Sequence, residues 1–212
     1  MNFIKCGLFI FSLLFSVIIF AQVTDNNGTP LKEGIYLTLK DFKENKPIPK
    51  KKVILAYDIN SLDYLKQATT RRILKYSDEN NNPQKIKIID IWGYCENNAL
   101  YKKEHLAEER EYSYKVQVVG SICLYLGSKR VGAMIAAGIV GVENAYVGRN
   151  QYMIDTENGE VMNAGAENLS RILKKDTLLY DEFHKLDYSN QQRNVFIVVK
   201  KYNDKHPFIF SK

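Results

Sequence analysis

The residues best suited to metal or acid–base chemistry form one charged run, Glu104–Glu109, in which His105 is accompanied by three carboxylates. On a helix, His105 and Glu109 lie one turn apart and share a face. The run is similar to the inverted zinc-protease pattern His-x-x-Glu-His, but Glu109 stands where the second histidine is needed. Because the ligand set is incomplete, the run predicts a solvated charged helix or loop and no metal site.

A second run rich in oxygen ligands is Asp155–Glu160. A calcium loop of the EF-hand type needs glycine at its sixth position and a bidentate glutamate at its twelfth. Here the glycine is fifth, at Gly159, and the twelfth residue is Ala166. The Asn-Gly pair at its centre instead predicts a hairpin turn.

No other stretch carries a motif for nucleotide binding, phosphate binding or serine hydrolysis. His184 and His206 have charged or polar neighbours, which is typical of surface histidines. We therefore predict no catalytic, cofactor-binding or metal-ligating residue and no cofactor. A hydrolase is the alternative, since catalytic residues need not be close in sequence.

Cys95 and Cys123 lie in apolar, strand-like runs. In an exported protein such a pair can form one disulfide. Two buried free thiols in neighbouring strands explain the same pattern, because a free cysteine behaves as a small apolar side chain. Both interpretations stay open.

Six aromatic residues cluster in the expected sheet. On one face they would form a surface that stacks on sugars or on a peptide. The alternative, which we prefer, is that aromatic side chains simply suit half-buried strands. The six are Trp92, Tyr94, Tyr101, Tyr112, Tyr114 and Tyr125.

The first 21 residues have the layout of a secretory signal peptide: Lys5, then an apolar run from Gly7 to Phe20, then polar sequence. We predict cleavage between Ala21 and Gln22. An uncleaved anchor is the alternative, although the apolar run is shorter than the ~20 residues that a membrane span needs. Either way residues 22–212 are exported, to the periplasm, the outer envelope or the extracellular space.

The formal net charge is +6, and the charged residues are scattered along the chain. This balance is compatible with an envelope polysaccharide, a lipid surface or a protein as partner, and export without a basic stripe disfavours nucleic acid. The segment 131–142 has no charged or hydrogen-bonding side chain. It is too short to span a bilayer, so we expect a buried element, with self-association or insertion into a membrane surface as alternatives.

The elements that must position these residues are mostly strands in the first part of the chain. Residues 22–33 predict a flexible N-terminal segment, and Thr38 with Asp41 predicts a capped short helix. Alternation and turn residues predict the strands. The expected strands are 34–37, 53–57, 72–76 paired with 85–94, 112–126 bent at Gly120, and 146–154 paired with 161–162; Asn97-Asn98 is an expected turn, and 61–69 a short helix.

The pattern changes to a helical period after residue 165. Leu169, Ile172 and Leu173 share one face, Asp176 is an expected cap, and Ser189 with Gln192 predicts another helix start. Behind that start, one helical face holds Val195, Val198, Val199 and Tyr202. The β-branched run Val195–Val199 is also compatible with a strand, but the caps favour a helix. The fold class is therefore α+β, a curved antiparallel sheet or partial barrel with C-terminal helices. One domain, 34–212, would be rich in sheet over 34–162 and helical over 165–203.

Several short stretches together resemble a loosely defined group of exported proteins of unknown function from Bacteroidota bacteria. The resemblance covers much of the chain and implies export but no activity. The stretches are Ile19-Phe20-Ala21-Gln22, Gly34 to Thr38 with Asp41-Phe42 and Asn45-Lys46-Pro47, Ile91 to Cys95, Ile154-Asp155 with Gly159-Glu160-Val161, and Tyr202-Asn203. We expect an exported, non-catalytic binding or structural module, with an exported hydrolase as the alternative.

Overall fold

The computed structural model describes residues 23–25, 27–106, 110–128 and 149–211. Its main feature is an antiparallel sheet of seven strands in the order β1-β4-β5-β6-β7-β8-β9, so β1 and β9 are its edges and the sheet is open. The predicted α+β class is confirmed. The seven strands are β1 (Gly34–Tyr36), β4 (Gly93–Glu96), β5 (Ala99–Leu106), β6 (Arg110–Val118), β7 (Ile122–Ser128), β8 (Arg149–Asp155) and β9 (Val161–Asn163).

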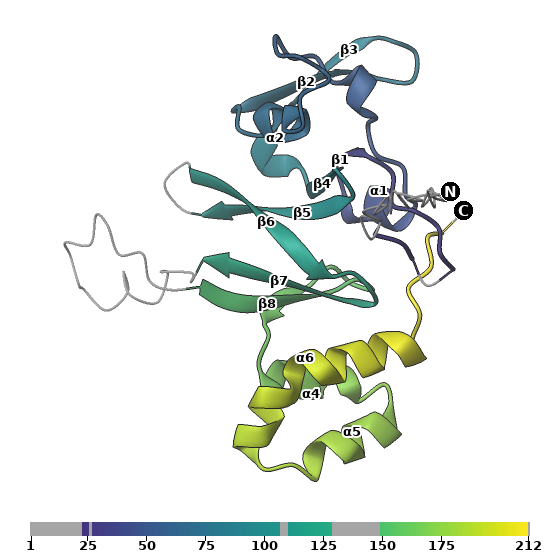
Figure 1. Ribbon diagram of the computed structural model, residues 1–212, viewed down its shortest axis with the longest axis vertical. Coiled ribbons are helices and arrows are strands. Elements are labelled where there is room, and N and C mark those ends of the chain that lie inside the picture. The colour runs from purple at the N-terminus through teal and green to yellow at the C-terminus, as the bar shows by residue number, and fades with distance from the viewer. Residues whose placement is uncertain (1–22, 26, 107–109, 129–148, 212) are drawn as a thin grey trace, which may run out of the picture.

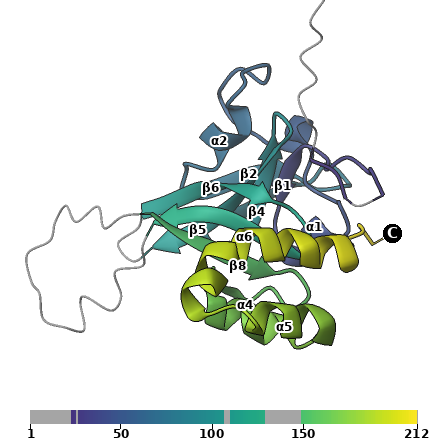
Figure 2. The same ribbon diagram turned by 60° about the horizontal axis from the view of Figure 1, so that its bottom comes forward.

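The helices and a second, smaller sheet surround this main sheet. Helices α4, α5 and α6 lie together at the β7–β8 end, as Figures 1 and 2 show, whereas the two-stranded sheet and α2 lie at the other end. The helices are α1 (Leu39–Lys43), α2 (Tyr64–Ala68), α4 (Ala166–Leu173), α5 (Thr177–His184) and α6 (Tyr188–Lys205); the small sheet is β2 (Ile73–Ser77) with β3 (Pro83–Lys87).

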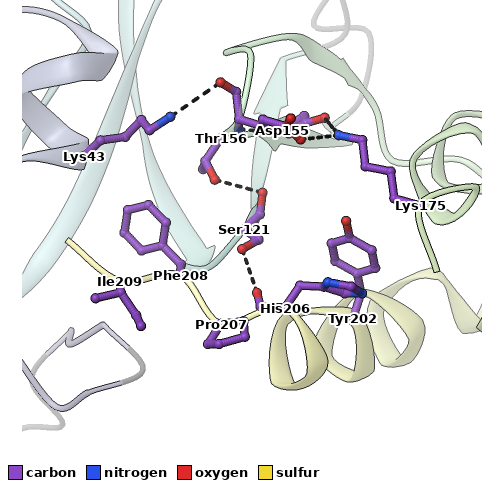
Figure 3. A pocket seen from close by; sticks show the side chains of 11 residues that line it. Lys43, Ser121, Asp155, Thr156, Lys175, Tyr202, His206, Pro207, Phe208 and Ile209 are labelled. Carbon is purple, nitrogen blue, oxygen red and sulfur yellow. Dashed lines mark hydrogen bonds and ion pairs between the residues drawn. The ribbon is translucent and has the colours of Figure 1, made fainter. Parts of the chain in front are cut away.

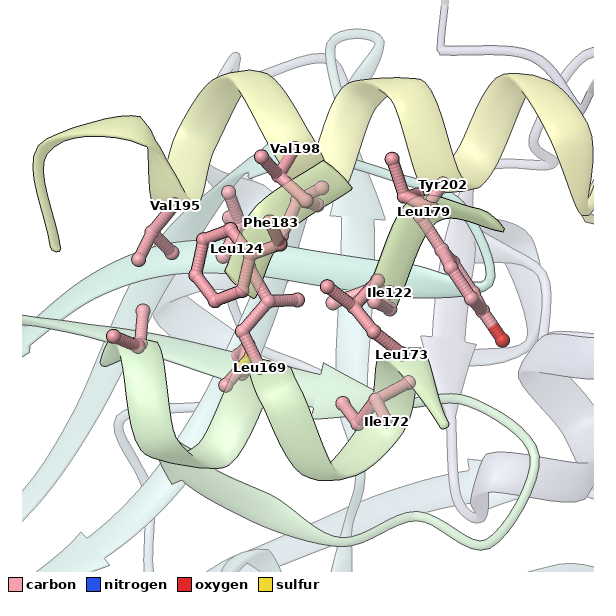
Figure 4. Close-up of a cluster of buried hydrophobic side chains, with 14 of the residues drawn as sticks. Ile122, Leu124, Leu169, Ile172, Leu173, Leu179, Phe183, Val195, Val198 and Tyr202 are labelled. Carbon is pink, nitrogen blue, oxygen red and sulfur yellow. The ribbon is translucent and has the colours of Figure 1, made fainter. Parts of the chain in front are cut away.

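The first four residues of β7 are buried, and their alternation places successive side chains in two different cores. Ile122 and Leu124 face the helices (Figure 4), whereas Cys123 and Tyr125 face the opposite side. The helical face predicted from Val195, Val198, Val199 and Tyr202 packs in the first core. The second core contains aromatic side chains of α1 and of the C-terminal tail, and a third lies between α2, the small sheet and β4.

The local turn and cap predictions are confirmed at most positions. Thr38 and Asp41 form a reciprocal capping box at the start of α1. Asn97 and Asn98 both adopt positive φ between β4 and β5, and the Asp176 side chain caps α5. One cap prediction is wrong: the N-cap of α6 is Asp187 and not Ser189, because the Asp187 carboxylate accepts the N–H of Asn190 and the helix already begins at Tyr188.

Three strand predictions are wrong because pairing partners, not alternation, decided the boundaries. In the run 53–57, only Val53 forms a bridge, to Tyr76. The run 85–94 is interrupted by a 3₁₀ turn at Ile88–Asp90, although its first part pairs with β2 as predicted. The run 112–126 is a hairpin of β6 and β7 and not one bent strand.

The expected flexible segment 22–33 is packed on the domain where the structure describes it. Leu31 is buried, and the Lys32 N–H donates to Asn45 Oδ1 over 2.9 Å. The Asp25 carboxylate accepts the N–H of Phe210 over 3.1 Å. These contacts with distant residues fix a segment whose own composition predicts flexibility.

Helix α6 is joined to β7 by a buried asparagine. Asn203 Oδ1 accepts the N–H of Ile122 over 2.8 Å, and its Nδ2 donates to the Ile122 carbonyl over 2.9 Å. The amide thus pairs with the start of β7 as a neighbouring strand would. Gly120 leaves the space for it, since a Cβ there would lie 2.3 Å from Asn203 Nδ2.

Candidate functional site

A cleft of about 420 Å³ lies where the β6–β7 and β8–β9 turns meet the end of α6. Figure 3 shows Lys43 of α1 on one side and Lys175, from the link between α4 and α5, on the other. The tail after α6 forms a further wall with Pro207, Phe208 and Ile209. Segments from both ends of the described chain therefore build this site.

The β8–β9 turn presents its polar groups in a fixed arrangement. Gly159 has a φ of 82°, a conformation that favours glycine, and its N–H donates to the Asp155 carbonyl over 2.7 Å. Asp155 Oδ1 accepts the N–H of Glu157 over 2.9 Å. The turn predicted from Asn158-Gly159 is confirmed. Two oxygen atoms of Asp155 already accept hydrogen bonds from the backbone of the same turn.

Hydrogen bonds through Ser121 connect this turn to the end of α6. The Thr156 N–H and hydroxyl both donate to the Ser121 carbonyl, over 3.0 and 2.9 Å. The Ser121 hydroxyl donates to the His206 carbonyl over 2.7 Å. Three segments that are far apart in sequence are thereby held at one end of the cleft.

Both signs of charge meet inside the cleft. Lys175 Nζ lies 3.5 Å from Asp155 Oδ2 and forms a closer ion pair with Glu157. Glu157 raises the pKa of Lys175, and Lys175 in turn lowers the pKa of Glu157, so both stay charged at neutral pH. Lys43 Nζ is 3.5 Å from the Glu157 carbonyl, at the outer limit of a hydrogen bond.

The α6 side of the cleft carries an aromatic pair next to an acid. The rings of Tyr202 and His206 lie 4.3 Å apart, and His206 Nε2 is 3.1 Å from Asp176 Oδ2. Burial raises the pKa of the Tyr202 hydroxyl, which therefore stays protonated. The hydrogen bond from the Leu179 N–H is the main reason that the pKa of Asp176 is lowered.

The structure separates the residues of the charged run Glu104–Glu109. Residues 104–106 belong to β5, which corrects the predicted helix or loop for them, and 107–109 lie outside the described residues. Glu104 is buried and accepts a hydrogen bond from the Tyr125 hydroxyl. In the described part of the chain, no three His, Cys, Asp or Glu side chains are grouped in a way that could hold a metal ion.

Cys95 and Cys123 are buried and free, so the structure has the second of the two arrangements left open by the sequence. Both belong to the second core. Burial raises the pKa of each thiol to about 12. Neither is a thiolate nucleophile at neutral pH.

The six aromatic residues do not form one exposed surface. Trp92, Tyr94 and Tyr125 are buried, Trp92 and Tyr125 in the second core and Tyr94 in the third. Tyr94 stacks on Tyr101 at 4.8 Å, whereas a second stack crosses the sheet through other rings. That second stack runs through Tyr112, Tyr114, Tyr125 and Tyr152. The alternative of one aromatic binding surface is therefore wrong for these six residues. Packing across the strands explains why they cluster in the sequence.

A serine and a histidine that no sequence motif connects are in contact between α4 and α5. Ser170 Oγ lies 2.9 Å from His184 Nε2, and His184 Nδ1 is 2.8 Å from the Tyr180 carbonyl. Since a carbonyl only accepts, Nδ1 carries a proton, and in the neutral imidazole Nε2 then accepts from the Ser170 hydroxyl. The pair is exposed, and the N–H of Ser170 lies within a helix, where it bonds the preceding turn.

The remaining predictions concern residues outside the described ranges. They are the leader 1–21 with its cleavage residues Ala21 and Gln22, and the apolar segment 131–142. None of the helices in the described part combines the length and apolar character that a membrane span needs.

Fold and site together define the class of this protein: an α+β domain with an open antiparallel sheet and a charged cleft at one end. Comparisons with models of protein families, with curated proteins and with solved structures found no match to this chain.

Proposed function

We propose that the protein is an exported, non-catalytic binding module whose charged cleft takes a small zwitterionic ligand, such as a free amino acid or a short peptide. Export is supported by the leader pattern of residues 1–21. The size of the cleft, about 420 Å³, is in the range of small-ligand sites.

The observation that carries the proposal is the pairing of fixed charges of both signs. The ammonium groups of Lys43 and Lys175 and the carboxylates of Asp155 and Glu157 all line the cleft. Their formal charges cancel, so a ligand with one carboxylate and one ammonium matches the cleft better than a simple anion or cation. Among the described residues, the hydrogen bond of the Lys43 ammonium is the long contact to the Glu157 carbonyl, so this group retains donors for a ligand carboxylate.

The absence of catalysis is supported by the protonation states. The thiols of Cys95 and Cys123 stay protonated because burial raises their pKa values. The raised pKa of Lys175 keeps that amine charged and therefore not nucleophilic.

The test is a titration of the full chain with alanyl-alanine, monitored through the NMR chemical shifts of the backbone amides. Acetate, methylamine and glucose are the comparison ligands. We expect the dipeptide to shift the amides of Thr156, Glu157 and His206, and Lys43→Met to weaken that binding. Lys40→Met is the matched control, because Lys40 is also on α1 but does not line the cleft. Two results would refute the proposal: acetate binds as tightly as the dipeptide, or the dipeptide causes no shift of the amides at the cleft.

An exported hydrolase is the second candidate because of the contact between Ser170 and His184, whose tautomer suits proton transfer from the serine. No backbone donor is available beside a serine within a helix to stabilise an oxyanion. Hydrolysis of p-nitrophenyl acetate by the wild type, lost in Ser170→Ala, would favour the hydrolase over the binding module.

A further inference from the structure

The small sheet β2–β3 lies at the end of the molecule opposite α4–α6 (Figure 1), and the residues on one of its faces are exposed. Its register pairs Ile73 with Lys87 and Lys75 with Lys85. All four residues are exposed, whereas Leu74 on the other face is buried in the third core. The solvent-facing side of this sheet therefore has a defined composition.

Three lysines dominate that face. Lys75 and Lys85 lie directly opposite each other, and Lys87 is a diagonal neighbour of Lys75. Like charges in direct cross-strand positions are unfavourable. In the described part of the chain, no carboxylate forms an ion pair with any of these three ammonium groups. An anionic partner would therefore relieve the repulsion between these ammonium groups.

Branched apolar side chains lie next to these lysines. The N–H of Ile54 donates to the Lys75 carbonyl over 2.8 Å, which places Ile54 beside Lys75 at the other edge of β2. Ile54 is 50% exposed and Ile73 is 49% exposed. Ile89, which follows β3, is 43% exposed. The face thus combines cations with neighbouring apolar groups that are left in water.

The acidic residues of the hairpin are at its ends. Asp78 lies in the β2–β3 turn, where its carboxylate accepts N–H groups of Asn80 and Asn82 over 2.9 Å. Glu79 is in the same turn, and Asp90 follows Ile89 after β3. The centre of the face is purely cationic and apolar.

From this placement we propose that the solvent-facing side of β2–β3 docks on the surface of an anionic lipid bilayer. The lysines would contact the headgroup phosphates, and Ile54 and Ile73 would enter the boundary between headgroups and acyl chains. A soluble polyanion would satisfy the lysines but leave the isoleucines exposed, which is why the bilayer is the better match. This surface is separate from the charged cleft and does not depend on its ligand.

The test is flotation of the full chain with vesicles of phosphatidylcholine and phosphatidylglycerol, mixed two to one, and with vesicles of phosphatidylcholine alone. We expect binding to the anionic vesicles only, and loss of binding at ~1 M salt, where the Debye length is ~3 Å. The triple variant K75Q/K85Q/K87Q should bind about 100-fold more weakly, since each lysine near an anionic surface contributes roughly fivefold.

Two further variants separate the bilayer from other partners. I54S/I73S should weaken vesicle binding roughly tenfold through lost apolar burial, and leave binding to dextran sulfate unchanged. K174Q/K185Q/K200Q removes the same charge from exposed lysines at the ends of α4 and α5 and in α6. It should weaken vesicle binding far less than K75Q/K85Q/K87Q does. Intact mass and thermal melting confirm that all chains are in the same processed, folded form.

Three outcomes would overturn the proposal. The first is no binding to anionic vesicles at low salt, and the second is an equal loss in both lysine triple variants. The third is vesicle binding that does not respond to I54S/I73S, which would point to a soluble polyanion as the partner of the lysines.

Discussion

Replacing Asn203 by alanine removes the amide that joins α6 to β7. In the native structure that amide satisfies both the N–H and the carbonyl of Ile122, at 2.8 and 2.9 Å. Ile122 is fully buried, so water cannot replace the lost partner without a rearrangement of the core. We expect a large loss of stability from this single substitution.

The magnitude follows from the two buried backbone groups that lose their partner. Leaving one such group unsatisfied costs about 1–3 kcal/mol, so the pair costs about 2–6 kcal/mol. The total free energy of unfolding of a domain is typically about 5–15 kcal/mol. For a chain of this length, a loss of ~4 kcal/mol lowers the melting temperature by roughly 8–16 °C.

The assay is urea unfolding followed by the fluorescence of Trp92, the single tryptophan, which is buried in the second core. Asn194→Ala is the matched control on the same helix. Its amide donates to the Asn190 carbonyl at an exposed position, so its removal should cost less than ~1 kcal/mol. If Asn203→Ala is as stable as this control, the reasoning about the α6–β7 joint is wrong.

A second substitution adds a pH signature. Asn203→Asp keeps the acceptor for the Ile122 N–H but places an oxygen against the Ile122 carbonyl, where only the protonated acid can donate. The folded-state pKa of the new carboxyl is therefore raised above its unfolded value of about 3.9. The variant should be most stable below that value and lose stability as the pH rises through the folded-state pKa.

Cys95 and Cys123 should resist iodoacetamide at about pH 8 in the native protein and both react after unfolding without a reductant, because burial raises both thiol pKa values to about 12. Rapid labelling of the native protein, or no labelling of the unfolded one, would contradict this. The Asp63 carboxyl should titrate at a pKa of about 2, since the side chains of Ser61 and Gln67 hydrogen-bond its ionised form. Its contribution to stability is then present above pH 3.8 and lost as the pH falls toward 2. NMR of the carboxyl should show a higher pKa of Asp63 in Ser61→Ala, and an unchanged pKa would refute the assignment.

Parts of the fold could be predicted because their determinants are local. The capping box of Thr38 and Asp41, the cap at Asp176 and the turn at Asn97-Asn98 each involve side chains and backbone within a few residues. The hairpin around Gly159 belongs to the same class. Such patterns report directly on the backbone conformations that these residues favour.

The charged cleft was not predicted, although its residues were visible in the sequence. Lys43, Ser121 and Lys175 carry no motif, and each is unremarkable among its neighbours. Their proximity depends on the strand order and on where α6 ends. The signal that could have pointed there was Gly120, whose missing side chain leaves room for Asn203 and brings α6 to the β6–β7 turn.

Helix α2 shows the same limit at a single helix end. The sequence predicts a short helix near residues 61–69, and the helix is there. Its first N–H groups are satisfied from a distant strand: the Glu96 carboxylate accepts from Leu65 over 2.6 Å and from Lys66 over 3.2 Å. No local pattern identifies that partner.

The mixture of strands and helices, the turns, most of the caps and the apolar face of α6 follow from the amino-acid sequence, because these features depend on residues that are near each other in the chain. Three other features follow from the packing of distant segments: the hairpin in 112–126, the free and buried state of Cys95 and Cys123, and the cleft that Lys43 and His206 both line. These features depend on strand order and on contacts between distant segments, for which neither composition nor spacing carries a specific signal.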